Sequence, residues 1–202
     1  MRKKVGLLGG TFNPPHVGHL IIANEVLEAL ELDEVRFMPN KTPPHKQMDE
    51  RVSEEDRIGM LSVAIDNHPK FQLELIEMER NGKSYTYDTI KLLKEREPKT
   101  DFYFIIGGDM IEYLPKWYQI DKLCQLVTFV GVRRPGYSVE TSYPVRLIDT
   151  PEIHLSSSLL REKAATNGTL RYLLPDQVIA YIKENQLYEP RTGITDCERA
   201  DH

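Results

Sequence analysis

The 202-residue sequence has little cysteine and no long apolar run. Its two cysteines, Cys124 in an apolar segment and Cys197 in a polar one, have neither the spacing of a zinc site nor the number of a disulfide framework, so we expect two free thiols. No stretch approaches the roughly 20 apolar residues that a membrane helix needs, and the basic residues 1–4 are not followed by the apolar core of a signal peptide. We therefore expect a cytoplasmic protein without a membrane segment.

An excess of positive charge is also absent. The 26 lysines and arginines are outnumbered by 31 aspartates and glutamates, which gives a formal net charge of -5 at pH 7. Domains that bind nucleic acid usually carry a basic surface, so this balance argues against a nucleic-acid partner. Small anionic ligands are not excluded, because they require only a local cluster of donors.

Short apolar runs alternate with helical patterns along the chain. The expected strands are 5–8, 35–38, 71–75, 102–106, 126–132 and 146–149, and the expected helices are 17–30, 53–67, 89–97, 113–125, 156–167 and 175–185. This alternation predicts an α/β fold, in which helices cover both faces of a doubly wound, mostly parallel sheet. We expect a single domain over residues 1–189, and a disordered or non-core tail over 190–202, which lack apolar periodicity.

The stretch GGTFNPPHVGH, residues 9–19, joins the first expected strand to the first helix. The glycines let the backbone approach a ligand, the prolines stiffen the turn, and His16 and His19 share one side of a starting helix. A strand that ends in glycine and leads into a helix N-terminus is suited to binding phosphate. Taken singly these are ordinary loop residues, and the stretch is neither a Gly-x-Gly-x-x-Gly fingerprint nor a Walker loop. The spacing as a whole favours an anion site.

A second candidate anion site begins at Ser156. The run Ser156-Ser157-Ser158 offers hydroxyls and free N–H groups at a helix start, and Arg161 follows within one turn. The alternative is a plain serine cap with a surface arginine.

A second glycine pair, Gly107-Gly108, ends the clearest strand and is followed by Asp109. In open parallel sheets ligands bind beyond the carboxyl ends of the strands, where the strand order reverses, so both glycine pairs are expected there. Asp109 has two interpretations: it holds ribose hydroxyls, which we favour, or it caps the next helix.

Residues 10–19 resemble the signature of the nucleotidylyltransferase superfamily, Gly-x-Phe-x-Pro-x-His-x-Gly-His. Residues 155–161 resemble that family's late Ile-Ser-Ser-Thr-x-Ile-Arg, with Leu155, Ser158 and Leu160 as the replacements. The resemblance implies transfer of a nucleotidyl group between phosphates. It also implies catalytic roles for His16, His19, Lys46 and Arg161.

Four further segments, 43–46, 83–89, 107–117 and 134–136, resemble the nicotinate mononucleotide adenylyltransferase branch, and the resemblance covers residues 3–189. It implies that the substrates are ATP and nicotinate mononucleotide, in NAD synthesis. The implied acceptor-binding residues are Thr86, Trp117 and Tyr118, with Trp117 stacked on the pyridine ring and Thr86 on the carboxylate. The implied ATP-binding residues are Gly9, Gly10, Thr11, Phe12, Gly107, Asp109, Arg134, Ser157 and Ser158.

The expected chemistry needs no general base, because a phosphate nucleophile is already ionised and catalysis reduces to alignment and charge stabilisation. The resemblance implies Mg²⁺, which we expect to arrive with ATP and to keep several waters, since no carboxylate cluster is dedicated to it. Two alternatives stay open: the same chemistry on another phosphate acceptor (nicotinamide mononucleotide, phosphopantetheine, or a polyol phosphate with CTP as donor), or a nucleotide-sensing protein without turnover. The oligomeric state also stays open, with a homo-oligomer as one option.

Overall fold

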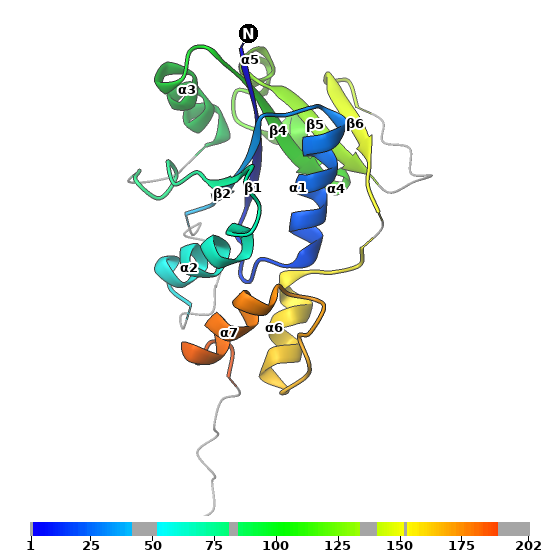
Figure 1. Ribbon diagram of the computed structural model, residues 1–202. Helices are drawn as coiled ribbons and strands as arrows, with labels where there is room; N and C mark the ends of the chain where they lie inside the picture. Colours follow the sequence, from blue (N-terminus) through cyan, green and yellow to red (C-terminus); the bar gives the residue numbers. More distant parts are fainter. Residues whose placement is uncertain (1, 42–51, 81–84, 134–140, 152, 190–202) are drawn as a thin grey trace, which may run out of the picture.

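The computed structural model describes residues 2–41, 52–80, 85–133, 141–151 and 153–189. Six strands form one parallel sheet in the order β3-β2-β1-β4-β5-β6. The strands are β1 (Lys3–Gly10), β2 (Glu34–Pro39), β3 (Phe71–Leu73), β4 (Thr100–Gly107), β5 (Thr128–Arg133) and β6 (Val145–Asp149). The strand order reverses between β1 and β4, so the switch point of this doubly wound sheet lies there (Figure 1).

The two central strands explain why the glycine pairs meet. Leu8 of β1 pairs with Ile105 of β4, and each strand runs two residues further to end at Gly10 and Gly107. Both strands have buried apolar side chains on both faces, as expected of central strands in a covered parallel sheet. The prediction that both glycine pairs lie at the switch point is confirmed.

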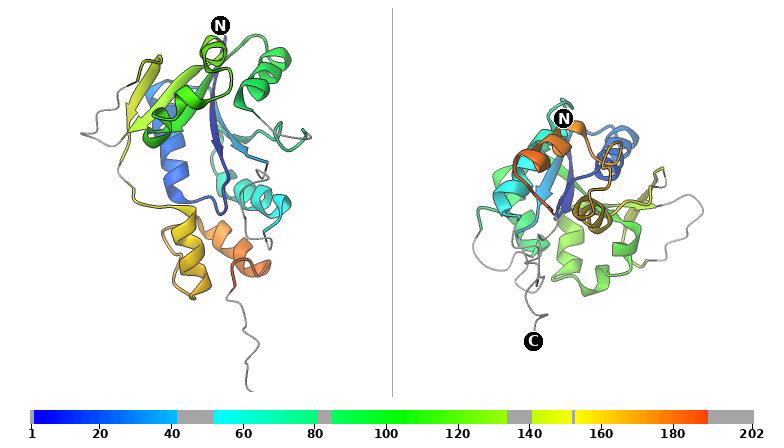
Figure 2. Two further views of the ribbon diagram at one scale, coloured as in Figure 1. Left: turned by 180° about the vertical axis from the view of Figure 1, so that it is seen from behind. Right: turned by 90° about the horizontal axis from the view of Figure 1, so that it is seen from below.

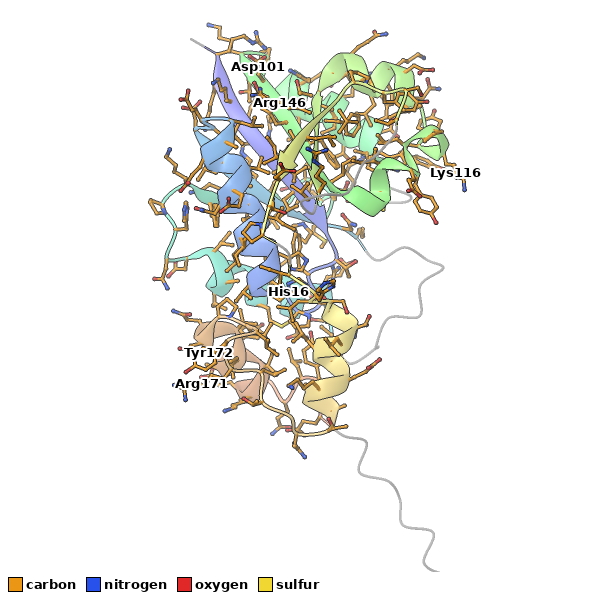
Figure 3. All side chains as sticks on the ribbon, turned by 90° about the vertical axis from the view of Figure 1, so that its right-hand side faces the viewer. His16, Asp101, Lys116, Arg146, Arg171 and Tyr172 are labelled. Carbon is orange, nitrogen blue, oxygen red and sulfur yellow. The ribbon has the colours of Figure 1, made fainter. Side chains whose placement is uncertain are left out.

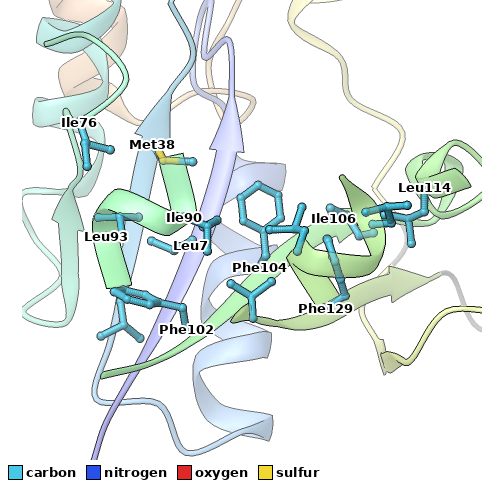
Figure 4. Close-up of a cluster of buried hydrophobic side chains, with 14 of the residues drawn as sticks. Leu7, Met38, Ile76, Ile90, Leu93, Phe102, Phe104, Ile106, Leu114 and Phe129 are labelled. Atoms are coloured by element: carbon cyan, nitrogen blue, oxygen red, sulfur yellow. The ribbon is translucent and has the colours of Figure 1, made fainter. Parts of the chain in front are cut away.

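Helices cover both faces of the sheet, which confirms the predicted fold class. They are α1 (Val17–Ala29), α2 (Glu54–Ile65), α3 (Thr86–Arg96), α4 (Gly108–Ile111), α5 (Ile120–Leu126), α6 (Ser157–Ala165) and α7 (Asp176–Glu184). One apolar cluster packs α3 and α5 on the sheet through Ile90, Leu93 and Leu123 (Figure 4), and another packs α1 and α2 on the other face through Val26 and Leu61.

A third apolar cluster lies beyond the carboxyl ends of the strands. There α6 and α7 pack with α2 through Leu160, Val178 and Met60 (Figures 1 and 2). Burying a side chain of this size contributes roughly 1.5–3 kcal/mol. Packing in this cluster places the start of α6 beside the carboxyl end of β1, where the first glycine pair lies.

Helices α2 and α6 begin where the sequence predicts, each after a serine. Ser53 accepts a hydrogen bond from the Asp56 amide, and Ser156 accepts one from the Leu159 amide, so both serines cap their helices as predicted. The helix predicted from residue 89 begins at Thr86, one turn earlier. The short helix α4 was not predicted.

The single helix predicted over 113–125 is wrong. A 3-10 turn over Leu114–Lys116 is followed by extended backbone at Trp117 and a left-handed residue, Gln119 (φ 54°), before α5 begins. The break lets Trp117 pack edge-on against Phe104 and Phe129, with ring centroids 5.9 Å from each. Burial of the indole therefore overrides the local helical pattern.

Within the described ranges, no helix is both long and apolar enough to span a membrane. The predicted loop over 39–48 falls mostly, and the tail over 190–202 entirely, outside the described residues.

Candidate functional site

The turn from β1 into α1 is the centre of the candidate site. β1 ends at Gly10, Phe12 adopts a left-handed conformation (φ 50°) with its side chain buried, and α1 begins after its N-cap residue His16. A Cβ atom on Gly10 would lie 3.0 Å from the Phe12 ring, so the glycine lets this ring fold back under the turn.

His16 and His19 form one stacked pair at the start of α1. Their ring centroids lie 3.7 Å apart at 27°, and the His19 ring also meets Phe12 edge-on at 5.0 Å. His19 Nδ1 accepts a 3.1 Å hydrogen bond from the His16 amide, so in the neutral imidazole the proton sits on Nε2. His19 can therefore donate to a ligand through Nε2–H.

Both histidines are neutral near pH 7. Burial lowers the pKa of His16 to about 4. Burial, with a smaller repulsion from His16, lowers the pKa of His19 to about 3. Neutral imidazoles interact through hydrogen bonds rather than through positive charge. The predicted role of the two histidines toward phosphate stays a prediction. His16 Nδ1 is buried without a hydrogen-bond partner among the described residues, which leaves one polar atom for a ligand or water to satisfy.

The start of α6 lies against this turn. Ser157 Oγ donates to the Pro14 carbonyl oxygen at 2.9 Å. Arg161 Nη1 donates to the Asn13 carbonyl oxygen at 2.8 Å, and its Nη2 donates to Ser158 Oγ at 3.0 Å. The two motifs predicted to act together are therefore in direct contact, and Arg161 is not the surface arginine of the alternative. Figure 3 shows His16 where α1 approaches α6.

Two residues that the sequence motifs do not include support the same turn. Arg57 of α2 has no exposed surface and donates through Nη1 to the carbonyl oxygens of Thr11, at 3.0 Å, and Asn40, at 2.8 Å. Tyr188, also buried, donates through its hydroxyl to the Asn13 side chain. The available signal for Arg57 was its position on the apolar side of α2.

The second glycine pair lies beside the first across the β1–β4 pair. Gly107 is the N-cap of α4 and Gly108 is its first residue, so Asp109 lies within the first turn of a helix that was not predicted. The Asp109 side chain, and the whole of Lys46 and Arg134, lie outside the described residues, so their predicted roles stay predictions.

The three predicted acceptor-binding residues separate into two groups. Thr86 is the first residue of α3, and the exposed ring of Tyr118 lies 4.6 Å from the ring of the preceding Tyr85. Trp117 is half-buried and packs on core aromatic rings instead. Tyr118 is therefore in ring contact with the residue that precedes α3. The sequence reading did not assign Tyr85 to this group.

Among the described residues, no group of three histidine, cysteine, aspartate or glutamate side chains is arranged to hold a metal ion. The donors that meet at the switch point are imidazole, hydroxyl, guanidinium and helix-terminal N–H groups, which suit phosphate oxygens rather than a cation. A magnesium ion at this site would have to be held largely by the phosphates of its nucleotide.

This fold and this arrangement of the two motifs define a Rossmann-like nucleotidyltransferase. The chain belongs to the cytidylyltransferase-like family, whose model matches residues 7–163, and within it to the group of curated relatives named nicotinate-nucleotide adenylyltransferase. The relative from Bacillus subtilis (strain 168) is 54% identical over 187 residues, covering 93% of this chain and 99% of its own. The relative from Geobacillus thermodenitrificans, named as a probable enzyme of this kind, is 56% identical over 197 residues, covering 98% and 91%.

A solved structure supports the fold independently. The Plasmodium falciparum nicotinic acid mononucleotide adenylyltransferase complexed with NaAD superimposes with a TM-score of 0.78 at 23% identity, covering 92% of this chain and 97% of that one. At this identity the likeness concerns the fold alone.

Proposed function

We propose that this protein transfers the AMP moiety of ATP to nicotinate mononucleotide, forming nicotinate adenine dinucleotide and pyrophosphate in NAD biosynthesis. The observation that carries the proposal is the contact of the two motifs at the switch point, where Arg161 bonds to the turn between β1 and α1. The names of relatives at 54–56% identity support the choice of substrates.

In the reaction, a phosphate oxygen of nicotinate mononucleotide attacks the α-phosphorus of ATP. The new P–O bond forms as the bond between the α-phosphorus and the bridging oxygen breaks, and the electron pair leaves with pyrophosphate. The attacking oxygen is already ionised at neutral pH, so no side chain has to remove a proton. The protein has to align two polyanions and stabilise the charge that develops on them.

The residues described above supply that stabilisation. We assign His19 Nε2–H and the neighbouring His16 to the phosphates near the reacting centre. Arg161, with the N–H groups of Ser157 and Ser158 at the start of α6, is assigned to the departing pyrophosphate. His16 is buried, so its interaction with a phosphate is stronger than it would be in water.

Seven further residues remain predictions of the resemblance. Lys46 is assigned to the phosphates, Asp109 to the ribose of ATP, and Arg134 to ATP binding. Gly9 and Gly10, with the backbone of Thr11 and Phe12, would line the nucleotide. We expect Mg²⁺ to enter as part of the ATP substrate and to keep several of its waters.

Acceptor choice is assigned to the start of α3. Uncharged donors at Thr86 suit a carboxylate, and the exposed Tyr118 ring offers an aromatic face to a cationic pyridinium. A buried donor set that an amide leaves partly unmatched discriminates strongly, so the acid should be preferred.

The proposal is tested by pyrophosphate release from ATP or CTP with a panel of acceptors: nicotinate mononucleotide, nicotinamide mononucleotide, phosphopantetheine and a polyol phosphate. We expect ATP with nicotinate mononucleotide to give the highest kcat/KM. Comparable values for the acid and the amide would contradict the acceptor assignment. Tight ATP binding without turnover on any acceptor would support a nucleotide-sensing protein instead. Gel filtration would decide whether the protein forms a homo-oligomer, and cell fractionation would test the expected cytoplasmic location.

A further inference from the structure

The most deeply buried charge of the described residues is the guanidinium of Arg57. Its side chain has no exposed surface, and its Nε and Nη2 atoms have no hydrogen-bond partner among the described residues. Its ion-pair partner is Glu54, whose carboxylate lies 3.9 Å from Nη2 and is one-third exposed. A buried charge with so little compensation is costly to keep, and a core residue of the same length is often as stable.

The hydrogen bonds that Arg57 does make indicate why a charged side chain is kept at this buried position. Its Nη1 donates to the carbonyl oxygens of Thr11 and Asn40, the residues that follow the carboxyl ends of β1 and β2. These two segments are already joined by a 2.8 Å hydrogen bond from the Asn40 amide to the Gly10 carbonyl oxygen. Arg57 therefore fixes the two strand ends from the side of α2.

Through the geometry of the peptide bond, the contact of Arg57 with the Thr11 carbonyl also sets the direction of the Phe12 N–H. In a trans peptide the C=O and the following N–H point in opposite directions. A Thr11 carbonyl that is held toward Arg57 thus aims the Phe12 N–H away from α2. Phe12 also has the left-handed backbone conformation that forms the bend of the turn. Such a conformation is strained in a residue other than glycine and persists where its surroundings impose it.

We propose that Arg57 is a positioning residue for the nucleotide: it turns the Thr11 and Asn40 carbonyl groups away from the phosphates and thereby aims the Phe12 amide at them. The inference rests on the proposed function for the identity of the ligand. It gives Arg57 no contact with substrate. Its buried positive charge also adds to the attraction for phosphate at the turn, because charges interact more strongly away from water.

The first experiment compares Arg57→Met and Arg57→Lys with a matched control. Arg36→Met removes another largely buried guanidinium, one that lies inside β2 and is bonded to Glu34, Glu74 and Glu97. For Arg57→Met we expect kcat/KM for ATP to fall on the order of 100-fold, since small displacements at a reacting centre cost this much. The KM for nicotinate mononucleotide should stay near the wild-type value.

The outcomes distinguish a positioning role of Arg57 from a contribution to stability alone. Arg57→Lys should recover part of the ATP kcat/KM, because it keeps a charged donor. Arg36→Met should lower the melting temperature and leave the kinetic constants of the folded protein unchanged. If the Arg57 and Arg36 variants lose ATP kcat/KM equally, or if Arg57→Met retains wild-type ATP kinetics, the inference is overturned.

A second measurement uses the wild-type protein and so does not depend on a variant that folds. Inorganic tripolyphosphate is titrated while the amide resonances are followed by NMR. We expect the Phe12 amide proton to shift downfield as a phosphate oxygen accepts from it. Shifts at the His19 ring without a shift at Phe12 would overturn the inference. If the wild type binds tripolyphosphate in this way and Arg57→Lys does so less, but neither forms a dinucleotide, the proposed function fails and the positioning role stands.

Discussion

Arg161 donates a 2.8 Å hydrogen bond to the carbonyl oxygen of Asn13, which lies 148 residues earlier in the chain. The same guanidinium donates to Ser158 on its own helix. The early turn and the late helix start are thus one unit, in which the Arg161 guanidinium joins the turn to α6. A guanidinium suits this place because its several N–H groups can hold the backbone and still reach an anion.

Replacing Arg161 should therefore damage both the turn and the grip on the departing phosphates. For Arg161→Ala we expect kcat/KM for ATP to fall by roughly 100-fold to 1,000-fold, the range for removing one donor to developing charge. Arg161→Lys should recover little, because an ammonium lacks the planar fork. Steady-state kinetics would check this, with Arg171→Ala as control. Arg171 stacks over the exposed Tyr172 ring at 5.1 Å, so its loss should change little.

The fold was largely predictable because each central element carries a strong local signal. β1 and β4 each contain a run of apolar residues and end in glycine, and the serines before α2 and α6 cap them as expected. The segment around Trp117 was mispredicted because its conformation is decided by long-range packing on Phe104 and Phe129, which no local pattern encodes.

The residues of the candidate site likewise divide into those that a local sequence pattern predicts and those that long-range contacts decide. His16, His19 and Arg161 were predictable because their spacing forms a motif. Arg57 and Tyr188 were not assigned to the site, because each reaches the turn from a segment that is distant in the sequence and adjacent only in three dimensions. A buried arginine is recognised from its surroundings rather than from its neighbours in sequence.

Stability should fall in acid because of the histidine pair. In the unfolded chain both imidazoles titrate near 6.5, whereas in the folded protein the pKa of His16 is about 4 and that of His19 about 3. The unfolded state then binds more protons between these values, so the contribution is complete above about pH 6.5 and is lost as pH falls toward 4 and 3. For His16 the gap corresponds to roughly 3 kcal/mol, at about 1.4 kcal/mol per pKa unit.

Urea unfolding at pH 7 and pH 4.5 would measure this loss. The variant His16→Gln should lose less stability between the two pH values than the wild type. His68→Gln, which changes a histidine outside the turn, should retain the wild-type difference. An equal pH dependence in wild type and His16→Gln would show that other groups cause the acid loss.

The two nitrogens of His19 can be tested separately. An asparagine places an oxygen near Nδ1 and keeps the acceptor for the His16 amide, whereas a glutamine places its amide nitrogen near Nε2 and keeps the outward donor. If Nε2–H stabilises the phosphates, His19→Asn should fold normally and lose about 100-fold or more in kcat, while His19→Gln should retain more activity. Melting temperature and single-turnover kinetics would check both variants. Near-normal kcat in a folded His19→Asn protein would remove this imidazole from the mechanism.

Substitutions of Trp117 and Tyr118 should affect different properties, stability for the first and acceptor binding for the second. Trp117 packs between two core aromatic rings, so Trp117→Ala should lower the free energy of unfolding by about 3–5 kcal/mol, as for other large aromatic truncations. Tyr118 is half-exposed, so Tyr118→Ala should leave stability within about 0.5 kcal/mol and raise the KM for nicotinate mononucleotide several-fold. Unfolding curves and acceptor KM values would measure both effects, with ATP as the fixed substrate. If only the tryptophan variant changes the acceptor KM, the indole rather than the phenol is the pyridine contact, and Trp117 must then leave its packing against the core when the acceptor binds.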